Sequence, residues 1–374
     1  QWPGAALSVP ALPWCWSLVL LFLICAFPFA ARTGRGARLV LIGAAAFSGR
    51  WCWQETWDAW RRPASVNYLD VGQGDGAVLR LPGAVILIDA GPPEAGRNVI
   101  LPYLREQGIN RLDLVIVTHP DLDHYGGLAY VAAHMPIGTV AYSGEDADTH
   151  AWKDLRTFLS MRRVPMIRVA RGQNLYDQGV KRGAGGEGYG DGDTGERIIL
   201  SVLSPEYPGQ FPDRNENSVV TLLLLNGRRF LFTGDMGPLT ESRLLAQAGD
   251  RMQGSILKVP HHGSDLSNDP AFLAAVRPPV AVLSAGRLNR FGHPGRATVA
   301  ALKGLESSLF LTARDGAVTY ACDRGGGRWS AYLRAGPGVP VDISAYAGRA
   351  NNAHHDHRGQ RVRQDYSGFS DQAK

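Results

Sequence analysis

Short apolar runs alternate with amphipathic segments from residue 65 onward, a pattern typical of an α/β domain. Asn226-Gly227 separates two of these runs and predicts a hairpin, because both residues tolerate the positive φ of a tight turn. We predict strands at residues 66–71, 77–81, 85–89, 112–117, 166–169, 219–225, 229–233, 256–259 and 280–284. We predict helices at residues 98–107, 152–162, 238–247 and 270–276. Residues 63–335 are therefore expected to form one α/β domain.

The first 62 residues follow a different pattern. Residues 1–31 carry no charge, and residues 12–31 form a mostly apolar run about as long as a membrane-crossing helix. A secretory signal peptide is the competing interpretation, but it needs a basic start, a shorter apolar core and a cleavage site. We therefore expect residues 1–62 to be the end of a longer transmembrane region.

A second apolar run decides on which side of the membrane the rest of the chain lies. Residues 39–49 are too few to cross unaided, but four tryptophans extend the run to residue 60 as an interfacial belt. The segment 39–60 is compatible with a short span, a re-entrant hairpin or an interfacial helix. The basic residues before it favour the cytoplasm, so a second crossing places residues 63–374 outside and no crossing leaves them inside.

Two further segments lack the apolar residues of a packed core. Residues 181–197 are rich in Gly and contain no large aliphatic side chain, which predicts a flexible insertion. Residues 336–374 are rich in Gly, Pro and polar residues, so we expect a disordered tail. The His-His-Asp-His sequence at 354–357 is expected to be a solvated part of that tail.

The net charge of +5 is concentrated near the N-terminus. Residues 1–62 hold six Arg, one Glu and one Asp, which leaves only +1 for the remaining 312 residues. If residues 63–374 bind nucleic acid, they must do so through a local patch of basic side chains. The four Cys show no paired spacing, so neither a zinc knuckle nor a disulfide framework is expected. No organic cofactor is predicted.

Metal-ligating side chains gather where predicted strands end. Loops that leave the strands of a sheet bring distant residues together, and carboxylates and imidazoles are ligands of divalent cations. The candidate ligands are His119, Asp121, Asp123, His124, Asp235, His261 and His262. The first four lie in VTHPDLDHYGG (117–127), which matches the pattern H-x-H-x-D-H except that Asp121 replaces the middle histidine.

Two further aspartates have alternative roles. Asp89 also ends a predicted strand, but a lone aspartate in that position is often a helix cap or a turn residue. Asp75, in the turn VGQGD, either faces the site or caps its own turn.

Five motifs follow one another along the chain: YLDVGQGDGAVL, ILIDAG, VTHPDLDHYGG, LFTGD and LKVPHHGS. Over about residues 65–335 the chain resembles the metallo-β-lactamase-fold domain of ComEC-type competence proteins, in which these motifs occur in the same order. Members of that family are inner-membrane channels of bacterial DNA uptake, and the apolar segments at 1–62 resemble the end of their transmembrane region. The resemblance implies an αββα sandwich outside the cytoplasmic membrane, with a metal site at one edge.

The same resemblance implies a function and partners. The domain is expected to be a nuclease that degrades the DNA strand that is not taken up. Its partners are then DNA, either single-stranded or incoming duplex, the membrane and other proteins of DNA uptake.

The resemblance also implies how the ligands are divided between two metal ions. One site keeps Asp123, His124 and a histidine of the 261–262 pair, with Asp235 shared between the sites. The other retains His119, Asp235 and Asp121. This second set is rich in oxygen, and oxygen ligands favour manganese or magnesium over zinc. We therefore expect one well-built site and one weaker site, with manganese or zinc as the metal and magnesium as a third candidate.

The weaker site lacks a ligand that the wider superfamily has. There another histidine lies between the 119–124 cluster and the bridging aspartate, but this chain has no histidine between His150 and His261. The corresponding segment is NENSVV (215–220), where Asn217 or Ser218 stands instead.

Phosphodiester hydrolysis is the chemistry that suits such a site, because a bound metal lowers the pKa of water and a second ion stabilises charge on the phosphoryl group. The catalytic candidates are Asp123, Asp235 and His293, the last for steering phosphate or protonating the leaving group. The substrate-binding candidates are Lys258, Ser264, Arg287 and Arg290. With Arg296, the basic residues form either a local patch or ordinary solvated charges.

Two alternatives to a DNA-uptake nuclease stay open. The same fold could hydrolyse cell-wall or lipid phosphoesters, as in the related phosphorylcholine esterases, and the near-neutral charge of residues 63–374 favours this. A domain with an incomplete site could instead bind DNA and gate a channel without catalysis. The apolar N-terminal segments and the ordered motifs favour the nuclease.

Overall fold

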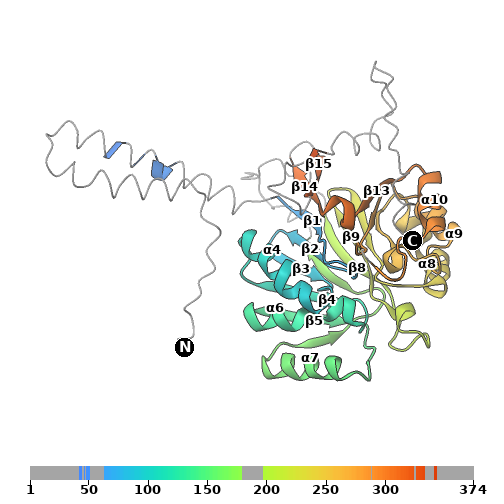
Figure 1. Ribbon diagram of the computed structural model, residues 1–374, viewed down its shortest axis with the longest axis horizontal. Helices are drawn as coiled ribbons and strands as arrows, with labels where there is room; N and C mark the ends of the chain where they lie inside the picture. Colours follow the sequence, from blue (N-terminus) through green and yellow to red (C-terminus); the bar gives the residue numbers. More distant parts are fainter. Residues whose placement is uncertain are drawn as a thin grey trace, which may run out of the picture.

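The computed structural model describes residues 42–43, 46, 48–50, 63–178, 197–287, 289–323, 326–332 and 341–342. The described strands form two sheets that pack face to face, with helices on their outer sides (Figure 1). The αββα sandwich expected from the sequence is therefore confirmed.

The first sheet contains nine described strands in the order β16-β15-β14-β1-β2-β3-β4-β5-β6. Its strands from β3 to β6 run parallel, so the carboxyl ends of β3 and β4 lie at the same edge. The strands are β1 (Ser65–Tyr68), β2 (Ala77–Leu81), β3 (Ala84–Ile88), β4 (Leu112–Val117), β5 (Ile137–Tyr142), β6 (Met166–Arg168), β14 (Ala317–Asp323), β15 (Gly326–Tyr332) and β16 (Val341–Asp342).

The second sheet contains seven described strands in the order β13-β12-β11-β10-β9-β8-β7. β9 and β10 form the hairpin predicted at Asn226-Gly227, whose φ angles are 49° and 69°. β10, β11, β12 and β13 run parallel. The strands are β7 (Asn174–Gln178), β8 (Ile198–Ser204), β9 (Val220–Leu225), β10 (Arg228–Phe232), β11 (Ile256–Lys258), β12 (Val280–Leu283) and β13 (Ser308–Leu311).

Helices cover the outer face of each sheet. Figure 1 shows α4, α6 and α7 on the side of the first sheet and α8, α9 and α10 on the side of the second. The helices are α3 (Pro93–Ala95), α4 (Leu101–Glu106), α5 (Leu122–Tyr125), α6 (Leu128–His134), α7 (His150–Met161), α8 (Pro238–Met252), α9 (Pro270–Val276), α10 (Arg296–Gly304) and α11 (Thr312–Asp315). Single turns of π- and 3-10-helix are η1 (Gly96–Ile100), η2 (Asn215–Asn217) and η3 (Pro260–Gly263).

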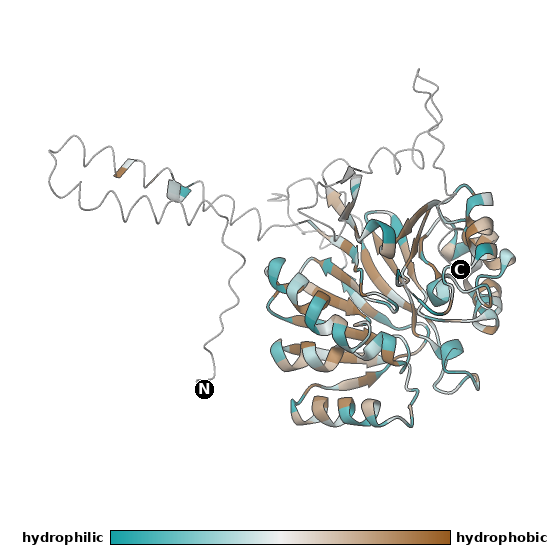
Figure 2. Ribbon diagram, viewed as in Figure 1, coloured by the Kyte–Doolittle hydropathy of each residue, from teal (hydrophilic) through white to brown (hydrophobic). Residues whose placement is uncertain are grey.

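Three apolar cores hold the four layers together. In β10, Phe230 and Phe232 pack between the sheets, while Leu231 packs against the helices of the second sheet. This alternation follows from the two-residue period of a strand. Because the sheets are covered on both faces, inner strands such as β3 (AVILI) and β12 (VAVL) are apolar along their length, and many strands are brown in Figure 2. Each fully buried Leu, Val, Ile or Phe contributes roughly 1.5–3 kcal/mol by leaving water.

Every predicted strand is present, with ends within three residues of the prediction. In place of the helix predicted at 98–107, the structure has a π-helical turn, Gly96–Ile100, followed by the short α-helix α4, Leu101–Glu106. The helix predicted at 238–247 continues to Met252. The additional strands that we did not predict are β5, β7, β8, β13, β14, β15 and β16. β5, with the sequence IGTVAY, mixes Gly and Thr into a short apolar run and so lacks a clear period.

Several predictions fall largely outside the described residues. They are the transmembrane segments within 1–62, the insertion at 181–197 and most of the tail at 336–374. Within the tail, Val341–Asp342 pairs with β15 as a short edge strand. Among the helices that the structure describes, none has the length and apolar character needed to cross a membrane.

Candidate metal centre

The predicted ligands lie in loops that leave β3, β4, β10 and β11. β3 and β4 are parallel neighbours in one sheet, and β10 and β11 are parallel neighbours in the other. Loops that follow the carboxyl ends of such strands converge, and ligands bind there in open α/β sheets. The loops carry Asp89, residues 118–124, Asp235 and His261-His262. The structure therefore brings together residues that are up to 173 positions apart in the chain.

Three imidazoles and two carboxylates face one another at this edge. His262 Nε2 lies 3.4 Å from Asp123 Oδ2 and 3.3 Å from Asp235 Oδ2. His124 Nε2 lies 3.3 Å from Asp235 Oδ1. Ligand atoms of His119, His124 and Asp235 lie within 4.8 Å of one another, and so do those of Asp123, His124 and His262. These are two overlapping ligand sets, with Asp235 in contact with both central imidazoles.

Buried polar atoms without partners point into this cluster. Nε2 of His119, His124 and His262 and Oδ1 of Asp235 are buried and have no hydrogen-bond partner. Each such atom costs about 1–3 kcal/mol when nothing satisfies it. A divalent cation satisfies several at once, because imidazole nitrogen and carboxylate oxygen are its ligands. The residues present therefore fit a metal ion.

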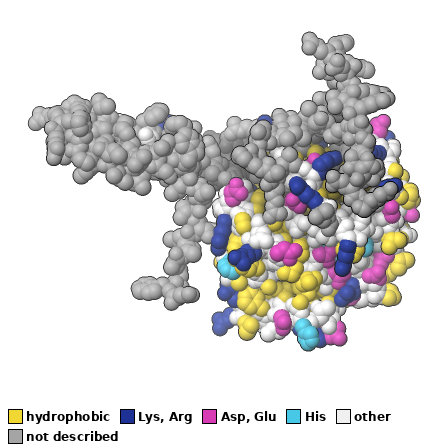
Figure 3. Space-filling model, viewed as in Figure 1, with side chains coloured by type: hydrophobic (Ala, Val, Ile, Leu, Met, Phe, Trp, Pro, Cys, Tyr) yellow, Lys and Arg dark blue, Asp and Glu magenta, His cyan; other side chains and the backbone are white. Residues whose placement is uncertain are grey.

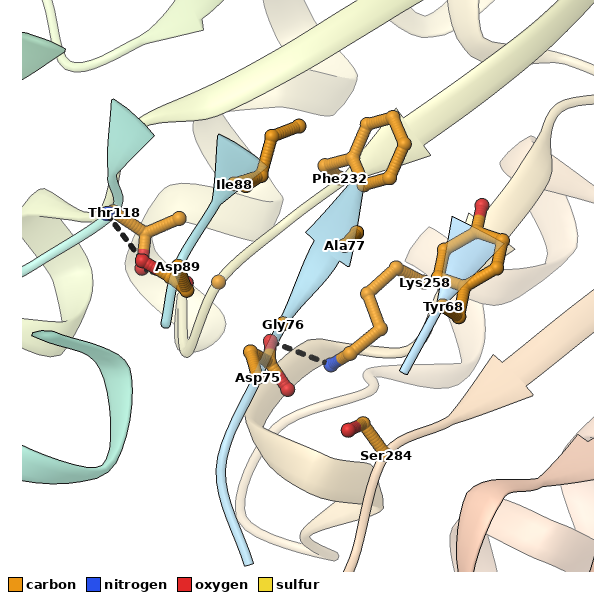
Figure 4. Close-up of a pocket in the computed structure, with 11 residues that line it drawn as sticks. Tyr68, Asp75, Gly76, Ala77, Ile88, Asp89, Thr118, Phe232, Lys258 and Ser284 are labelled. Atoms are coloured by element: carbon orange, nitrogen blue, oxygen red, sulfur yellow. Dashed lines mark hydrogen bonds and ion pairs between the residues drawn. The ribbon is translucent and has the colours of Figure 1, made fainter. Parts of the chain in front are cut away.

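A buried carboxylate holds His124 from behind. Asp89 Oδ2 lies 2.8 Å from His124 Nδ1, and Asp89 also accepts hydrogen bonds from the backbone N–H and the hydroxyl of Thr118, both at 2.8 Å (Figure 4). A bond of this kind fixes a metal-binding imidazole with its other nitrogen facing the metal. Asp89 is fully buried, so it is not a solvated turn residue. His262 is held differently, with Nδ1 2.9 Å from the carbonyl oxygen of Ser284.

The electrostatics of the cluster favour a cation. Burial lowers the pKa of His124, but Asp235 and Asp89 outweigh it and raise that pKa well above its usual value. Burial also lowers the pKa of His262, and Asp235 and Asp123 likewise reverse the effect. His119 has no such close carboxylate behind it, and burial with the neighbouring His124 lowers its pKa to about 3. The negative charges therefore concentrate around His124 and His262, where a metal ion and protons compete.

The His261-His262 turn is strained and is held by the helix layer. Both residues have positive φ, at 47° and 54°, which is uncommon for residues other than glycine. Asn268 Nδ2 donates to two carbonyl oxygens of the turn region at 2.9 and 3.1 Å, and the Asn268 N–H donates to the buried Glu241 carboxylate at 2.6 Å. The turn places His262 inside the cluster. His261 stays at its rim, with Nε2 3.7 Å from Asp235 Oδ2.

Asp121, the substituted position of the motif, also lies at the rim. Its Oδ2 is 3.7 Å from His119 Nε2, and its Oδ1 pairs with Arg214 Nη2 at 3.1 Å. Burial raises the pKa of Asp121, and Arg214 acts in the opposite direction. Asp121 therefore lies between a candidate metal ligand and a cation.

Ser218 is the residue that faces the cluster from the NENSVV segment. Its hydroxyl lies 3.5 Å from His119 Nδ1 and accepts a hydrogen bond from the Asp235 N–H at 3.3 Å. Asn217 points elsewhere, because its side chain exchanges hydrogen bonds with the backbone of Phe211 at 2.7 and 2.9 Å. A hydroxyl oxygen thus stands beside His119, and the amide of Asn217 fixes a neighbouring loop.

His293 lies beside the two-histidine turn. Its ring centroid is 5.8 Å from that of His261 and 6.2 Å from that of His262. Asn289 fixes its backbone, accepting from the His293 N–H at 2.8 Å and donating to its carbonyl oxygen at 2.7 Å. Burial, with the His262 and His261 imidazoles next, lowers the pKa of His293. The position is near enough for the predicted role in substrate contact, which stays a prediction.

The predicted basic patch is only partly on the surface. Arg287 and Arg290 are exposed, and Arg287 also donates to a backbone carbonyl at 2.6 Å. Lys258 is 4% exposed and pairs with Asp75 at 2.8 Å, because a buried ammonium needs a counter-charge. It therefore does not lie on an exposed patch with the arginines. Ser264 is also buried, and its hydroxyl accepts a backbone N–H at 3.2 Å.

Three residues of the site region gave no signal in the sequence. Arg214 reaches Asp121 from a loop 93 positions away, and Glu241 and Asn268 support the two-histidine turn from α8 and the segment before α9. No local spacing marks such contacts.

The sequence profile of the metallo-β-lactamase superfamily matches residues 69–287, which is more than half of the chain. With the αββα fold and the clustered ligands, this shows that the chain belongs to the metallo-β-lactamase superfamily. The superfamily fold implies that the site binds a divalent metal.

Within that superfamily, the resemblance to ComEC-type competence proteins is also confirmed. The chain is 27% identical over 285 residues to ComE operon protein 3 of Bacillus subtilis (strain 168), covering 71% of this chain and 34% of that protein. It is 27% identical over 263 residues to competence protein ComA of Neisseria gonorrhoeae, covering 70% and 33%. The chain thus spans about a third of the length of these curated relatives.

Among solved structures, the chain is similar to Igni18, a metallo hydrolase from the archaeon Ignicoccus hospitalis. The TM-score is 0.43 and the sequence identity 16%, over 69% of this chain and 100% of the other.

Proposed function

We propose that residues 63–335 form a metal-dependent phosphodiesterase that cleaves DNA, and that it is the nuclease of a membrane-anchored DNA-uptake protein. The observation that carries the proposal is the set of buried, unpartnered ligand atoms that converge from His119, His124, Asp235 and His262. Such a centre suits hydrolysis of a phosphodiester. Similarity to proteins named for competence supports DNA as the substrate.

A divalent cation held by Asp123, His124, Asp235 and His262 would polarise the phosphodiester and make a nucleophile available near neutral pH. The residues of the chain supply the geometry. Asp89 fixes the ring of His124 from behind, and Asp235 lies between the imidazoles of His124 and His262.

Other residues act on the substrate in this proposal. His293, beside the two-histidine turn, contacts the phosphate or the leaving oxygen. The exposed Arg287 and Arg290 attract the DNA backbone, because their positive charges neutralise its phosphates.

The metal site around His119 is the weaker one in this proposal. His119 is its main nitrogen ligand, and Asp121, 3.7 Å from His119 Nε2, makes the surroundings rich in oxygen. Oxygen ligands favour manganese or magnesium, whereas the imidazoles of the other site also suit zinc. We therefore propose manganese or zinc as the metal, with one or two ions bound.

The arrangement along the chain completes the proposal. Residues 1–62 anchor the domain in the inner membrane, residues 63–335 lie outside the cytoplasm, and residues 336–374 are a tail. The long apolar run in the first segment supports the anchor. Other proteins of DNA uptake are the expected partners.

Two other functions are supported by particular observations. A phosphodiesterase of cell-wall or lipid phosphoesters fits the near-neutral charge, and Figure 3 shows basic and acidic side chains interspersed on the face in view. A DNA-binding gate without catalysis fits the lack of a histidine at the NENSVV segment.

One experiment separates the three functions. The full chain, purified in detergent, is incubated with single-stranded DNA and with a phosphocholine ester under manganese, magnesium or zinc, beside the Asp123→Ala variant. We expect metal-dependent cleavage of DNA by the wild type and none by the variant. Cleavage of the ester alone supports the second function. Salt-dependent DNA binding without cleavage under any metal supports the third.

A further inference from the structure

One buried cation lies directly behind the metal centre. Among the described residues, Lys258 is the only lysine or arginine that is buried. Its Nζ lies 2.8 Å from Asp75 Oδ2 and donates to the Val259 carbonyl oxygen at 3.0 Å. In Figure 4 its side chain extends past Tyr68 and ends at Asp75, in a cavity that Ser284 also lines. The Lys258 ammonium is therefore paired inside the protein and does not face solvent.

Asp75 is fixed in the cluster by its backbone. Its N–H donates to the Asp123 carbonyl oxygen at 3.3 Å, and its own carbonyl accepts from the Gly91 N–H at 2.8 Å. The preceding Gly74 has a φ of 132°, and a Cβ there would lie 2.2 Å from the Asp123 carbonyl oxygen. Only glycine permits this close approach. The turn VGQGD is thus packed against the loop that carries Asp123.

The free oxygen of Asp75 faces His262. Asp75 Oδ1 is buried, has no hydrogen-bond partner and lies 3.3 Å from His262 Nδ1, which also lies 2.9 Å from the Ser284 carbonyl oxygen. Asp89 stands in the same relation to His124, at 2.8 Å. Each central imidazole therefore has a carboxylate on the side away from the candidate metal, but only the carboxylate behind His262 is paired with a buried lysine.

We propose that Lys258 and Asp75 form a positioning pair that orients the ring of His262 for the metal, and that Lys258 does not contact substrate. The ammonium holds one carboxylate oxygen so that the other stays directed at Nδ1. Carboxylate partners of ligating histidines typically change metal affinity 10- to 100-fold when they are removed. The proposal rests on the proposed metal centre, but not on DNA as the substrate.

The direction in which metal affinity changes when Lys258 is replaced separates the positioning role from the alternatives. If Lys258 acted only by its charge, its loss would remove repulsion and tighten the binding of a divalent cation. If Lys258 bound substrate, metal affinity would stay unchanged or tighten. A positioning role alone predicts that metal binding weakens, because Asp75 loses the partner that directs it.

The test measures the binding of Mn²⁺ to the full chain in detergent, with free Mn²⁺ followed by its electron paramagnetic resonance signal. The variants are Lys258→Met, Asp75→Asn and the two together, with Arg229→Met as the matched loss of an exposed cation on the adjacent β10. We expect each single variant to raise the Mn²⁺ dissociation constant 10- to 100-fold and Arg229→Met to leave it within twofold. Because Lys258 acts through Asp75, the double variant should be no weaker than Asp75→Asn.

Other outcomes overturn the proposal. Tighter or unchanged Mn²⁺ binding by Lys258→Met assigns it a purely electrostatic or substrate role, and multiplying effects in the double variant show that the residues act independently. If circular dichroism shows that Lys258→Met does not fold, the double variant is tested in its place, because it leaves no unpaired charge buried. Wild-type affinity in that variant also refutes the pair. If the wild-type chain binds Mn²⁺ but cleaves no DNA, the proposed nuclease fails, whereas the pair is still judged by the Mn²⁺ affinities of the variants.

Discussion

Glu241 should make the free energy of unfolding depend on pH near neutrality. Its carboxylate is fully buried on α8 and accepts the N–H groups of Asn268 at 2.6 Å and Asp269 at 2.8 Å. These bonds hold the segment that supports the His261-His262 turn. Burial raises the pKa of Glu241 to about 7, and the two backbone hydrogen bonds only partly oppose this.

The direction of the effect follows from that pKa. Since the pKa in the folded protein lies above the ordinary 4.5, the fold favours the protonated carboxyl of Glu241. The stabilisation is fully present below pH 4.5 and is lost as the pH rises through 7. At about 1.4 kcal/mol per pH unit, the loss across this window is about 3 kcal/mol.

Urea unfolding of the full chain in detergent, followed by circular dichroism between pH 4 and 8, measures this loss. The Glu241→Gln variant keeps an uncharged side chain of the same shape. We expect the unfolding free energy of the wild type, relative to the variant, to fall by about 3 kcal/mol from pH 4 to pH 8. Asp154→Asn removes an exposed carboxylate on α7 and controls for the loss of one charge.

Two results would refute the reasoning. A difference that stays constant with pH means that burial does not disfavour the charged form of Glu241. A difference that grows with pH means that the two backbone hydrogen bonds to the carboxylate outweigh its burial. In the second case Glu241 would stabilise the fold as an anion, and the sign given above would be wrong.

Three further predictions concern the metal and the membrane. Asp123→Ala should lose most bound metal and all turnover, and wild-type metal content by elemental analysis would place the site elsewhere. Asp121→His should shift the activity ratio from manganese toward zinc, because imidazole is the softer ligand; an unchanged ratio with a lower melting temperature would leave Asp121 a turn residue. A reporter fused after Lys374 should be active only outside the cytoplasm, and cytoplasmic activity contradicts the proposed topology.

The sequence alone determined the layers of the fold and most of the ligand candidates. Strands such as β4 and β12 are short, mostly apolar and bounded by turn residues, and this local signal suffices to place them. His119, Asp123, His124 and Asp235 follow such strands directly. Local patterns recover them because a ligand at a strand end keeps a fixed place relative to an apolar run.

The tertiary structure decided which side chains face inward and what supports them. Whether His261 or His262 enters the cluster depends on a turn with positive φ, held by Asn268 and Glu241. Lys258 looked like a surface cation until the fold placed Asp75, 183 positions earlier, against its ammonium. Such contacts join segments that are distant in the chain, so no spacing within one segment encodes them. Burial and contact between distant segments therefore decided the positioning of the site, whereas periodicity decided its elements.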